Sequence, residues 1–369
     1  MGLFRKVRRR SRADHIIIYS LIFLVIFGLA MLASASSHIG KLRFNDSYYY
    51  LKHQLLYGLT LGIIGFFLGS KIYYRVYEKI AVIFLLINII LLLLVFTPLG
   101  ITAGGAERWV KIGPVSFQPG EFLKLSLVIY LAAWLGRQRS RSSSFIKGFL
   151  PLLIVLTVVI AILLKQPSTT TALLLMVTAL IIYFVSGARL SFIIGAFLIG
   201  AIALGSIIYF SPYRWERIQT FLNPETNIQT TGYHINQALI AIGSGGLLGR
   251  GYGQSTAKVR YLPEPIGDSI FVVIAEELGF VGAFVLIGVF VLLVTRIFLL
   301  TKKAPDRFGQ LLLTGFALII GLQVFINIAA VSGAIPLTGA PLPFISFGGT
   351  ALAVFLTMAG IINNIAKHS

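Results

Sequence analysis

The stretch IIIYSLIFLVIFGLAMLASA, residues 16–35, decides the fold class of this chain. About 20 apolar residues in a helix cross the hydrocarbon core of a bilayer, which is roughly 30 Å thick. The stretch contains no charged residue, and no cleavage site of small residues leads from it into a soluble domain. It therefore predicts a first membrane-spanning helix and not a cleaved signal peptide.

Nine further apolar runs follow along the chain. Apolar residues make up 57% of the 369 residues and charged residues only 12%, about half of the roughly 25% typical of soluble domains. Backbone in lipid must satisfy its own hydrogen bonds, so each run is predicted to be a helix. The fold class is therefore an all-α polytopic membrane protein with about ten transmembrane helices, at residues 16–35, 55–68, 80–97, 122–135, 149–164, 171–185, 190–210, 278–294, 311–331 and 345–365.

The charge is one-sided, with 31 Lys and Arg against 12 Asp and Glu, a net +19. Such a balance is also typical of nucleic-acid-binding proteins, so the positions of the basic residues decide. Six lie in the first fifteen residues, and the other short basic loops are 71–79, 137–147 and 296–307. The positive-inside rule then places both termini in the cytoplasm, and a basic tail there attracts anionic lipid, not nucleic acid. One transmembrane domain, residues 16–366, is predicted between a tail, residues 1–15, and a C-terminus, residues 367–369.

The polar residues gather in loops on the opposite, outer side. The largest loop, residues 211–267, joins the seventh and eighth predicted helices, and two others span 100–120 and 333–344. Loops of such length are usually functional, which predicts a site on the outer face. The chain has no cysteine and its five histidines lack ligand spacing, so no disulfide, zinc or haem centre is expected.

In the first outer loop, Glu121 and Lys124 lie three residues apart on a helix that is predicted to start at Pro119. Ionisable groups that enter an apolar span need partners. Two interpretations are open: a structural ion pair that fixes the helix, or a pair that lines a substrate cavity. Trp109 likewise belongs either to an interfacial aromatic belt or to a wall against which a sugar or lipid packs, and Gln166-Pro167 predicts a polar turn.

The long loop carries Arg214 and Arg217, then an amphipathic helix over residues 232–243, and then a glycine-rich stretch, residues 244–253. Six of those ten residues are Gly or Ser, so the backbone can approach a ligand closely. Together with Arg250, Lys258 and Arg260 the stretch could hold phosphate oxygens. The alternative is a flexible connection.

Asp268 lies where the long loop re-enters the membrane. It is either a helix N-cap or a carboxylate in a half-apolar cleft, whose raised pKa suits a general base. A helix from Asp268 to Leu300 would measure about 50 Å, which is too long for a straight span. We therefore expect an interfacial piece, a tilt or a break near residues 276–279, and a structural role for Glu276 and Glu277.

At these positions the chain resembles the SEDS family (shape, elongation, division and sporulation) over essentially its whole length, and its FtsW branch more than its RodA branch. The family pattern departs at Gly120 (usually Ser), Ser168 (Asp), Gly267 (Thr), Ser269 (Phe) and Phe347 (Tyr). The stretch at 251–255 favours the FtsW branch. The motifs that match are Arg108-Trp109, Gln118-Pro119-Gly120-Glu121 with Lys124, Gln166-Pro167, Ser244-Gly245-Gly246, Tyr261-Leu262-Pro263-Glu264 with Asp268, Ala275-Glu276-Glu277-Leu278-Gly279, Ile326-Asn327 and Pro341-Leu342-Pro343-Phe344-Ile345-Ser346-Phe347-Gly348-Gly349.

The resemblance implies a peptidoglycan glycosyltransferase that polymerises lipid II into β-1,4-linked glycan strands at the outer face of the cytoplasmic membrane. It implies Asp268 as the catalytic residue and a class B penicillin-binding protein as partner, within the division or elongation machinery. A divalent cation, Mg²⁺ or Mn²⁺, is the one cofactor considered, with no metal ligands assigned. The alternative function is a lipid II flippase, which the one-sided polar residues and the lack of a clear inverted repeat disfavour. The residues expected to bind substrate are Arg108, Trp109, Glu121, Lys124, Arg214, Arg217, Ser244, Gly245, Gly246, Arg250, Lys258, Arg260, Glu264, Pro343 and Ser346.

Overall fold

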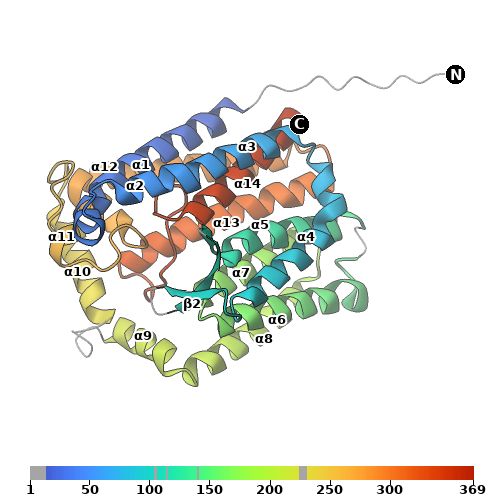
Figure 1. The fold of residues 1–369 in the computed structure, drawn as a ribbon. Helices are drawn as coiled ribbons and strands as arrows, with labels where there is room; N and C mark the ends of the chain where they lie inside the picture. The colour runs from blue at the N-terminus through green and yellow to red at the C-terminus, as the bar shows by residue number, and fades with distance from the viewer. Residues whose placement is uncertain (1–13, 104–105, 114, 139–140, 224–230) are drawn as a thin grey trace.

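The computed structural model describes residues 14–369 except 104–105, 114, 139–140 and 224–230, so most of the predicted N-terminal tail lies outside it. Its long helices lie beside one another along one direction, with α10 and α11 at one end of the bundle (Figure 1). The helices are α1 (His15–Phe44), α2 (Tyr49–His53), η1 (Gln54–Leu59), α3 (Thr60–Lys71), α4 (Arg75–Leu94), α5 (Pro119–Gly136), η2 (Phe145–Phe149), α6 (Leu150–Lys165), α7 (Thr169–Val185), α8 (Leu190–Tyr209), α9 (Pro212–Leu222), α10 (Thr231–Ser244), α11 (Ala257–Arg260), α12 (Ile270–Thr301), α13 (Arg307–Val331) and α14 (Gly349–Lys367).

Each of the ten predicted apolar runs lies in or overlaps a helix. Among the described residues, eight helical stretches are long and apolar enough to cross a membrane, and they include the continuous stretches Tyr49–Lys71 and Phe145–Lys165. The other two runs fall in α5, which contains Glu121 and Lys124, and in the shorter α7. The polytopic helical class is therefore confirmed, while the count of ten spans stays a prediction. The last predicted run, residues 345–365, begins before its helix does, because residues 345–347 lie in the turn that precedes α14.

The helices divide into a central group and a lipid-facing group. Of the most apolar window of α14, 78% is buried inside the protein, against 67% in α13 and 6% in α8. Helices α13 and α14 accordingly lie in the middle of the bundle in Figure 1, and α8 lies at its edge. Because α8 is apolar and almost wholly exposed, lipid is the environment that its surface fits.

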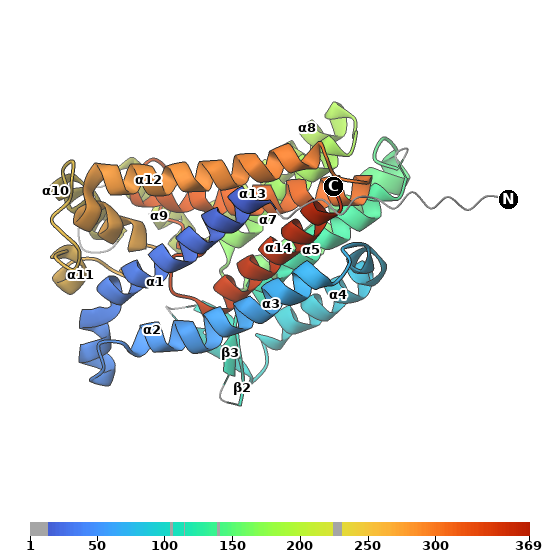
Figure 2. The same ribbon diagram turned by 90° about the horizontal axis from the view of Figure 1, so that it is seen from above.

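The first outer loop folds as a small sheet, which the all-α class did not predict. Strands β1 (Gly100–Ala103), β2 (Ala106–Ile112) and β3 (Val115–Phe117) pair antiparallel in the order β1-β2-β3. They project from one side of the bundle in Figure 2. Val110 on β2 is fully buried while Ile112 is exposed, and Gly113, at φ 61°, makes the turn into β3. The strands are too short to stand out in a single sequence.

Helix α12 is broken inside, as its predicted length required. Gly279 has φ 66° and ψ −167°, which is not a helical conformation. Across this break, the glycine-rich stretch, residues 244–253, runs alongside: the amides of Phe280 and Val281 donate to the carbonyls of Gly246 and Leu247 at 2.9 and 3.1 Å. The break therefore lies at the end of the bundle that holds Asp268, where α12 begins.

Candidate active site

Asp268 immediately precedes α12, but it does not cap that helix. The N-cap is Ser269, and the cap interpretation of Asp268 is therefore wrong. One carboxylate oxygen, Oδ1, accepts a hydrogen bond from Ser269 Oγ at 3.3 Å. The other, Oδ2, faces Gly339, where an added Cβ atom would lie 3.7 Å away.

The environment of Asp268 changes its acidity in the direction that a general base needs. Burial raises the pKa of its carboxyl from 3.8 to about 6, because desolvation disfavours the charged form. The hydrogen bond from Ser269 and the positive charge of Arg217 act in the opposite direction. At neutral pH the group is thus mostly ionised, yet basic enough to accept a proton.

The backbone of Asp268 is held against the α13–α14 loop, residues 332–348. Asn327 on α13 donates from Nδ2 to the carbonyl oxygens of Asp268 and Ala340, at 2.7 Å in both cases. Ser346 Oγ donates to the carbonyl of Gly267 at 2.6 Å and accepts from the amide of Leu342 at 2.8 Å. These bonds make Asp268 and the α13–α14 loop one unit.

The predicted pair of Glu121 and Lys124 supports that loop from α5. Lys124 Nζ lies 2.7 Å from Glu121 Oε1 and donates to Gln323 Oε1 at 2.8 Å, and Gln323 Nε2 in turn donates to the carbonyl of Pro341 at 2.8 Å. Glu121 and Lys124 are only 3% and 2% exposed. The ion pair is confirmed, and through Gln323 it is linked to the α13–α14 loop; contact of Glu121 or Lys124 with a substrate stays a prediction.

Arginines hold the loops around Asp268 in place. Arg108 on β2 donates from Nε to the carbonyl of Gln166 at 3.3 Å and also bonds Pro167, while Arg214 on α9 donates to Thr169 Oγ1 at 3.0 Å. Arg217, also on α9, donates to the carbonyl of Leu337 in the α13–α14 loop at 3.1 Å.

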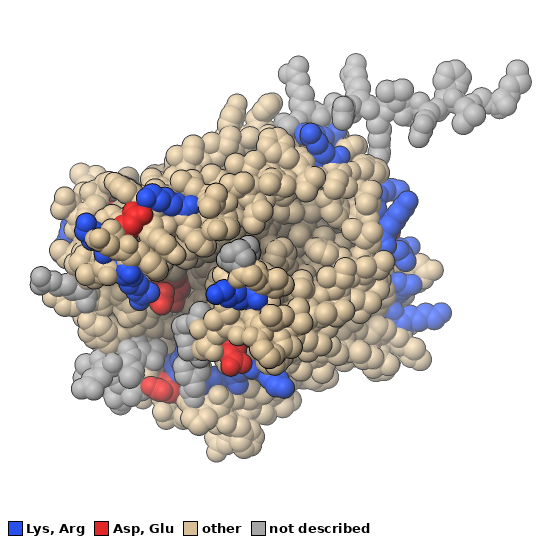
Figure 3. Space-filling view, viewed as in Figure 1, with Lys and Arg blue, Asp and Glu red and all other residues tan. Residues whose placement is uncertain are grey.

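These contacts tie the sheet and α9 to the α6–α7 turn and to the α13–α14 loop. The polar turn predicted at Gln166-Pro167 lies between α6 and α7, where Arg108 meets it. Acidic and basic side chains surround a hollow on this face of the molecule (Figure 3).

Comparison with known proteins agrees with this architecture. The model of the FtsW, RodA and SpoVE family, described as cell cycle proteins, matches residues 14–369. The chain belongs to this family.

Individual relatives match over nearly their full length. The probable peptidoglycan glycosyltransferase FtsW of Geobacter sp. (strain M18) is 37% identical, over 98% of this chain and 99% of its own. The stage V sporulation protein E of Bacillus subtilis (strain 168) is 35% identical over the same shares. The chain also superposes on the solved structure titled "Structural coordination of polymerization and crosslinking by a peptidoglycan synthase complex", with a TM-score of 0.81, 26% identity and coverage of 96% and 97%.

In this FtsW, RodA and SpoVE family member, the glycine-rich stretch does not present its amides to a ligand. The amides of Arg250 and Gly251 donate to the carbonyls of Glu276 and Glu277, and the amide of Gly253 donates to Glu277 Oε2 at 2.9 Å. Ser244, Gly245 and Gly246 also make contacts inside the protein, so their positions do not support the expected contacts with substrate. A Cβ atom on Gly245 would lie 2.1 Å from Ala275 O, Gly246 O accepts from Phe280, and Ser244 Oγ bonds Ala241 O. Close packing against the α12 break explains Gly245 and Gly249, and positive φ angles explain Gly246, Gly251 and Gly253, so these contacts do not support a phosphate cradle.

Lys258 is likewise used inside the protein. Its Nζ lies 2.5 Å from Glu277 Oε1 and donates to Ser34 Oγ at 2.8 Å, and the residue is 5% exposed. The expectation that Lys258 binds diphosphate is therefore not supported by its position, since its charge neutralises a buried carboxylate. The predicted structural role of Glu276 and Glu277 agrees with these contacts, because Ser255 and Thr256 donate to Glu276.

The other residues that were expected to bind substrate lie in several different parts of the fold. Arg250 is exposed and lies 3.4 Å from Glu276 Oε1, while the side chain of Arg260 lies outside the described part of the structure. Glu264 is exposed, with φ 48°, in the turn before Asp268. Pro343 is buried in the α13–α14 loop, and Trp109 is partly exposed on β2.

Several site residues had no role assigned from the sequence. In the sequence, Asn327 is identified only as part of a motif, and no function is predicted for Gln323, His234 or Ser269. An amide in an apolar helix was the available signal for Asn327 and Gln323, since a polar side chain in such a helix needs a partner.

A metal centre is not built into the described residues. Within residues 14–369 as described, no three His, Cys, Asp or Glu side chains cluster so that they could hold a metal ion. The carboxylates of Glu276 and Glu277 already accept several hydrogen bonds and an ammonium group. The donor set of the described residues therefore does not fit a divalent cation held by protein side chains.

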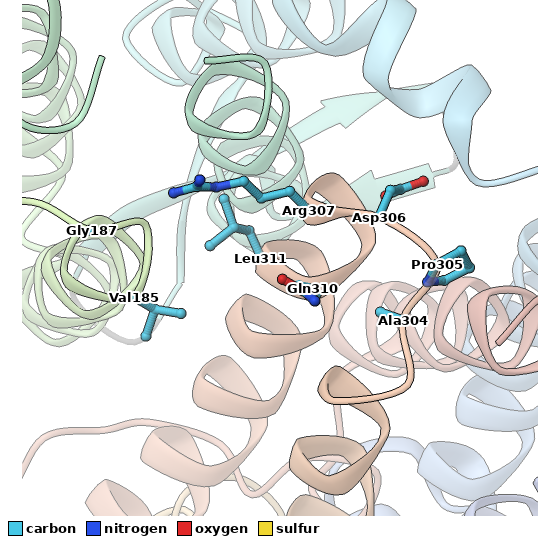
Figure 4. A pocket seen from close by; sticks show the side chains of 8 residues that line it. All are labelled: Val185, Gly187, Ala304, Pro305, Asp306, Arg307, Gln310 and Leu311. Atoms are coloured by element: carbon cyan, nitrogen blue, oxygen red, sulfur yellow. The ribbon is translucent and has the colours of Figure 1, made fainter. Parts of the chain in front are cut away.

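A cavity of about 410 Å³ lies at the other end of α12, far from Asp268 along that helix. Figure 4 shows the residues that line it, which come from the end of α7 and the α7–α8 turn, from the α12–α13 turn and from the start of α13. Its two charged residues are engaged: Arg307 donates to the carbonyl of Ser186, and Asp306 accepts from Tyr74 and Arg75. These contacts join loops at the end of the bundle where basic side chains line one edge in Figure 3.

Proposed function

We propose that this protein is a peptidoglycan glycosyltransferase that polymerises lipid II into β-1,4-linked glycan strands, with Asp268 as its general base. The observation that supports this role most directly is the position of Asp268. Its carboxylate is partly buried, its pKa is raised to about 6, and its Oδ2 oxygen faces Gly339, which has no side chain. Relatives that carry the name probable peptidoglycan glycosyltransferase FtsW cover almost the whole chain.

The reaction requires one base and one cationic region. Lipid II carries a disaccharide-peptide on an undecaprenyl diphosphate, and the α-linked donor becomes a β-linked product. A single displacement with inversion therefore suffices. Asp268 Oδ2 takes the proton of the acceptor 4-hydroxyl as its oxygen attacks the donor C1, and the bond from C1 to the diphosphate oxygen breaks. No covalent enzyme intermediate is needed.

The departing diphosphate needs positive charge. Arg217 is the best-placed described cation, because its charge acts on Asp268 across the site and its guanidinium touches the α13–α14 loop. Arg250, exposed at the edge of the same end, and Arg260 are the other candidates that we assign to the diphosphate. Guanidinium groups suit this task because they donate several charge-assisted hydrogen bonds to phosphate oxygens.

The setting of this reaction is the outer face of the cytoplasmic membrane. The positive-inside rule supports that orientation, because the short basic loops share the end of the bundle opposite Asp268. A class B penicillin-binding protein is the partner that we propose, in cell division or elongation. The matching synthase complex, whose title joins polymerization with crosslinking, supports this assignment.

The test is polymerisation of fluorescent lipid II by the purified full chain, with and without a cognate class B penicillin-binding protein. Asp268→Asn keeps the volume of the side chain but removes the base, and we expect at least a hundredfold loss of polymer. Asp46→Asn is the matched control, because Asp46 pairs with exposed Lys52 outside the site. Full polymer from a folded Asp268→Asn protein would overturn the proposal. Movement of lipid II across sealed vesicles without polymer would instead favour the flippase.

A further inference from the structure

A chain of two hydrogen bonds leads from Asp268 to a neighbouring helix. Ser269 Oγ donates to Asp268 Oδ1 at 3.3 Å, and His234 Nε2 lies 2.8 Å from the same Ser269 oxygen. Ser269 is fully buried, whereas His234 on α10 is partly buried.

The directions of these bonds follow from the chemistry of the groups. An ionised carboxylate only accepts, so the Ser269 hydroxyl must give its single proton to Asp268 Oδ1. Ser269 Oγ can then only accept from His234, which requires a proton on His234 Nε2. The neutral ring satisfies this requirement, and burial keeps it neutral because it lowers the pKa of His234.

The Ser269 bond holds Oδ1 of the carboxylate, while Oδ2 lies on the side of Gly339. With Oδ1 held by Ser269, rotation of the carboxylate is restricted and Oδ2 stays directed toward Gly339. A base whose orientation is fixed before substrate binds needs no reorganisation during proton transfer.

We propose that Ser269 and His234 are positioning residues for Asp268, and that they act together as a donor chain that orients the carboxylate and keeps it ionised. This inference rests on the proposed function, since it assumes that Asp268 is the base. His234 acts through Ser269 and does not touch the carboxylate itself.

Charged groups also act on Asp268 and His234. Arg217 on α9 lowers the pKa of both Asp268 and His234, and Glu264, in the turn before Asp268, raises that of His234. From α13, the contact is the neutral amide of Asn327, which bonds the backbone of Asp268. The Ser269 bond itself lowers the pKa of Asp268, so its removal must raise that pKa.

The experiment is the pH profile of kcat for lipid II polymerisation by the full chain in detergent, between pH 5 and 8.5. Ser269→Ala removes the donor to Asp268, and we expect the acid limb to move up by about one pH unit. At pH 6 the ionised fraction of Asp268 then falls from about one half to about one eleventh, a roughly fivefold loss from ionisation alone. At pH 8 the carboxyl is almost fully ionised in both proteins, so a loss of rate there measures lost orientation.

Variants at His234 separate positioning from packing. Gln can place its Nε2 amide near the position of the imidazole Nε2 and donate to Ser269, so His234→Gln should keep the wild-type profile. His234→Leu cannot donate and should move the acid limb in the same direction as Ser269→Ala. A thermal unfolding scan checks that each variant is folded.

Each result of these experiments either supports or contradicts the inference. If neither Ser269→Ala nor His234→Leu moves the acid limb, the donor chain does not keep Asp268 ionised and the inference is wrong. If Asp268→Asn remains active, the proposed base itself is wrong, which is a different failure. Wild-type profiles for His234→Gln together with shifted profiles for the two disruptive variants would support the inference.

Discussion

The side-chain nitrogen of Asn327 lies 2.7 Å from the backbone carbonyl oxygen of Asp268, and the same nitrogen lies 2.7 Å from the carbonyl oxygen of Ala340. One amide therefore joins the start of α12 to the α13–α14 loop. Asn327 is 1% exposed, so water cannot replace these bonds. Through Asn327, helix α13 therefore fixes the distance between Asp268 and the α13–α14 loop.

Replacing Asn327 by Leu should impair both catalysis and stability. The change leaves two buried carbonyls without a donor, at a cost of about 1–3 kcal/mol each. We expect at least a tenfold loss of lipid II polymerisation and a lower unfolding temperature. The control is Asn363→Leu on α14, because Asn363 is also buried and makes only a 3.4 Å bond to Ser70. Equal losses of activity in the two variants would contradict this role of Asn327.

The polymerisation rate should rise with pH through about 6. The proposed base, Asp268, can accept a proton only when ionised, and its pKa is raised to about 6. The ionised fraction then rises from about 9% at pH 5 to about 91% at pH 7, a change of about tenfold. Initial rates at saturating lipid II measure this change, with lipid II binding recorded at each pH. A rate that stays flat between pH 5 and 7 would exclude Asp268 as the group that limits the reaction.

The ion pair of Lys258 and Glu277 allows a test of structural against substrate-binding roles. Lys258→Met leaves Glu277 charged and buried without its partner, which costs roughly 3–5 kcal/mol. The double variant Lys258→Met with Glu277→Gln removes both charges and should recover most of the stability. Unfolding temperatures measure this recovery. If Lys258 instead bound diphosphate, the double variant would be stable but unable to polymerise lipid II.

The sequence predicted well those features that depend on local pattern. The apolar runs located the helices, Pro119 marked the start of α5, and the excessive length of the helix that follows Asp268 indicated the break that Gly279 makes. The spacing of Glu121 and Lys124 predicted their ion pair. Each of these depends on helix geometry and on the cost of charge in an apolar environment, both of which act over a few residues.

Features that depend on distant contacts were not accessible from one sequence. Lys258 bonds Ser34, more than 200 residues away, and this contact turns an apparent phosphate ligand into a structural group. The choice between cap and base for Asp268 likewise depended on the position of Ser269 and on Asn327 from another helix. Nothing in the local pattern specifies which helix faces which residue, so these alternatives stayed open.

The break in α12 should tolerate no side chain at Gly279. A Cβ atom there would lie 2.3 Å from Gly249 N and 2.6 Å from Leu247 O, so Gly279→Ala must push the glycine-rich stretch away. Gly253 is the matched control, because it also has a positive φ, 82°, but no atom within 4 Å of an added Cβ. Backbone strain alone should cost Gly253→Ala about 1–2 kcal/mol.

Gly279→Ala should lose clearly more stability than Gly253→Ala and should also lose polymerisation, because α12 begins one residue after Ser269, beside Asp268. Unfolding temperatures and lipid II assays on the two variants measure both effects. Similar unfolding temperatures of the two variants would show that the glycine-rich stretch moves away from the break at little cost in stability. A stable Gly279→Ala protein with full activity would further show that the position of Asp268 does not depend on this break.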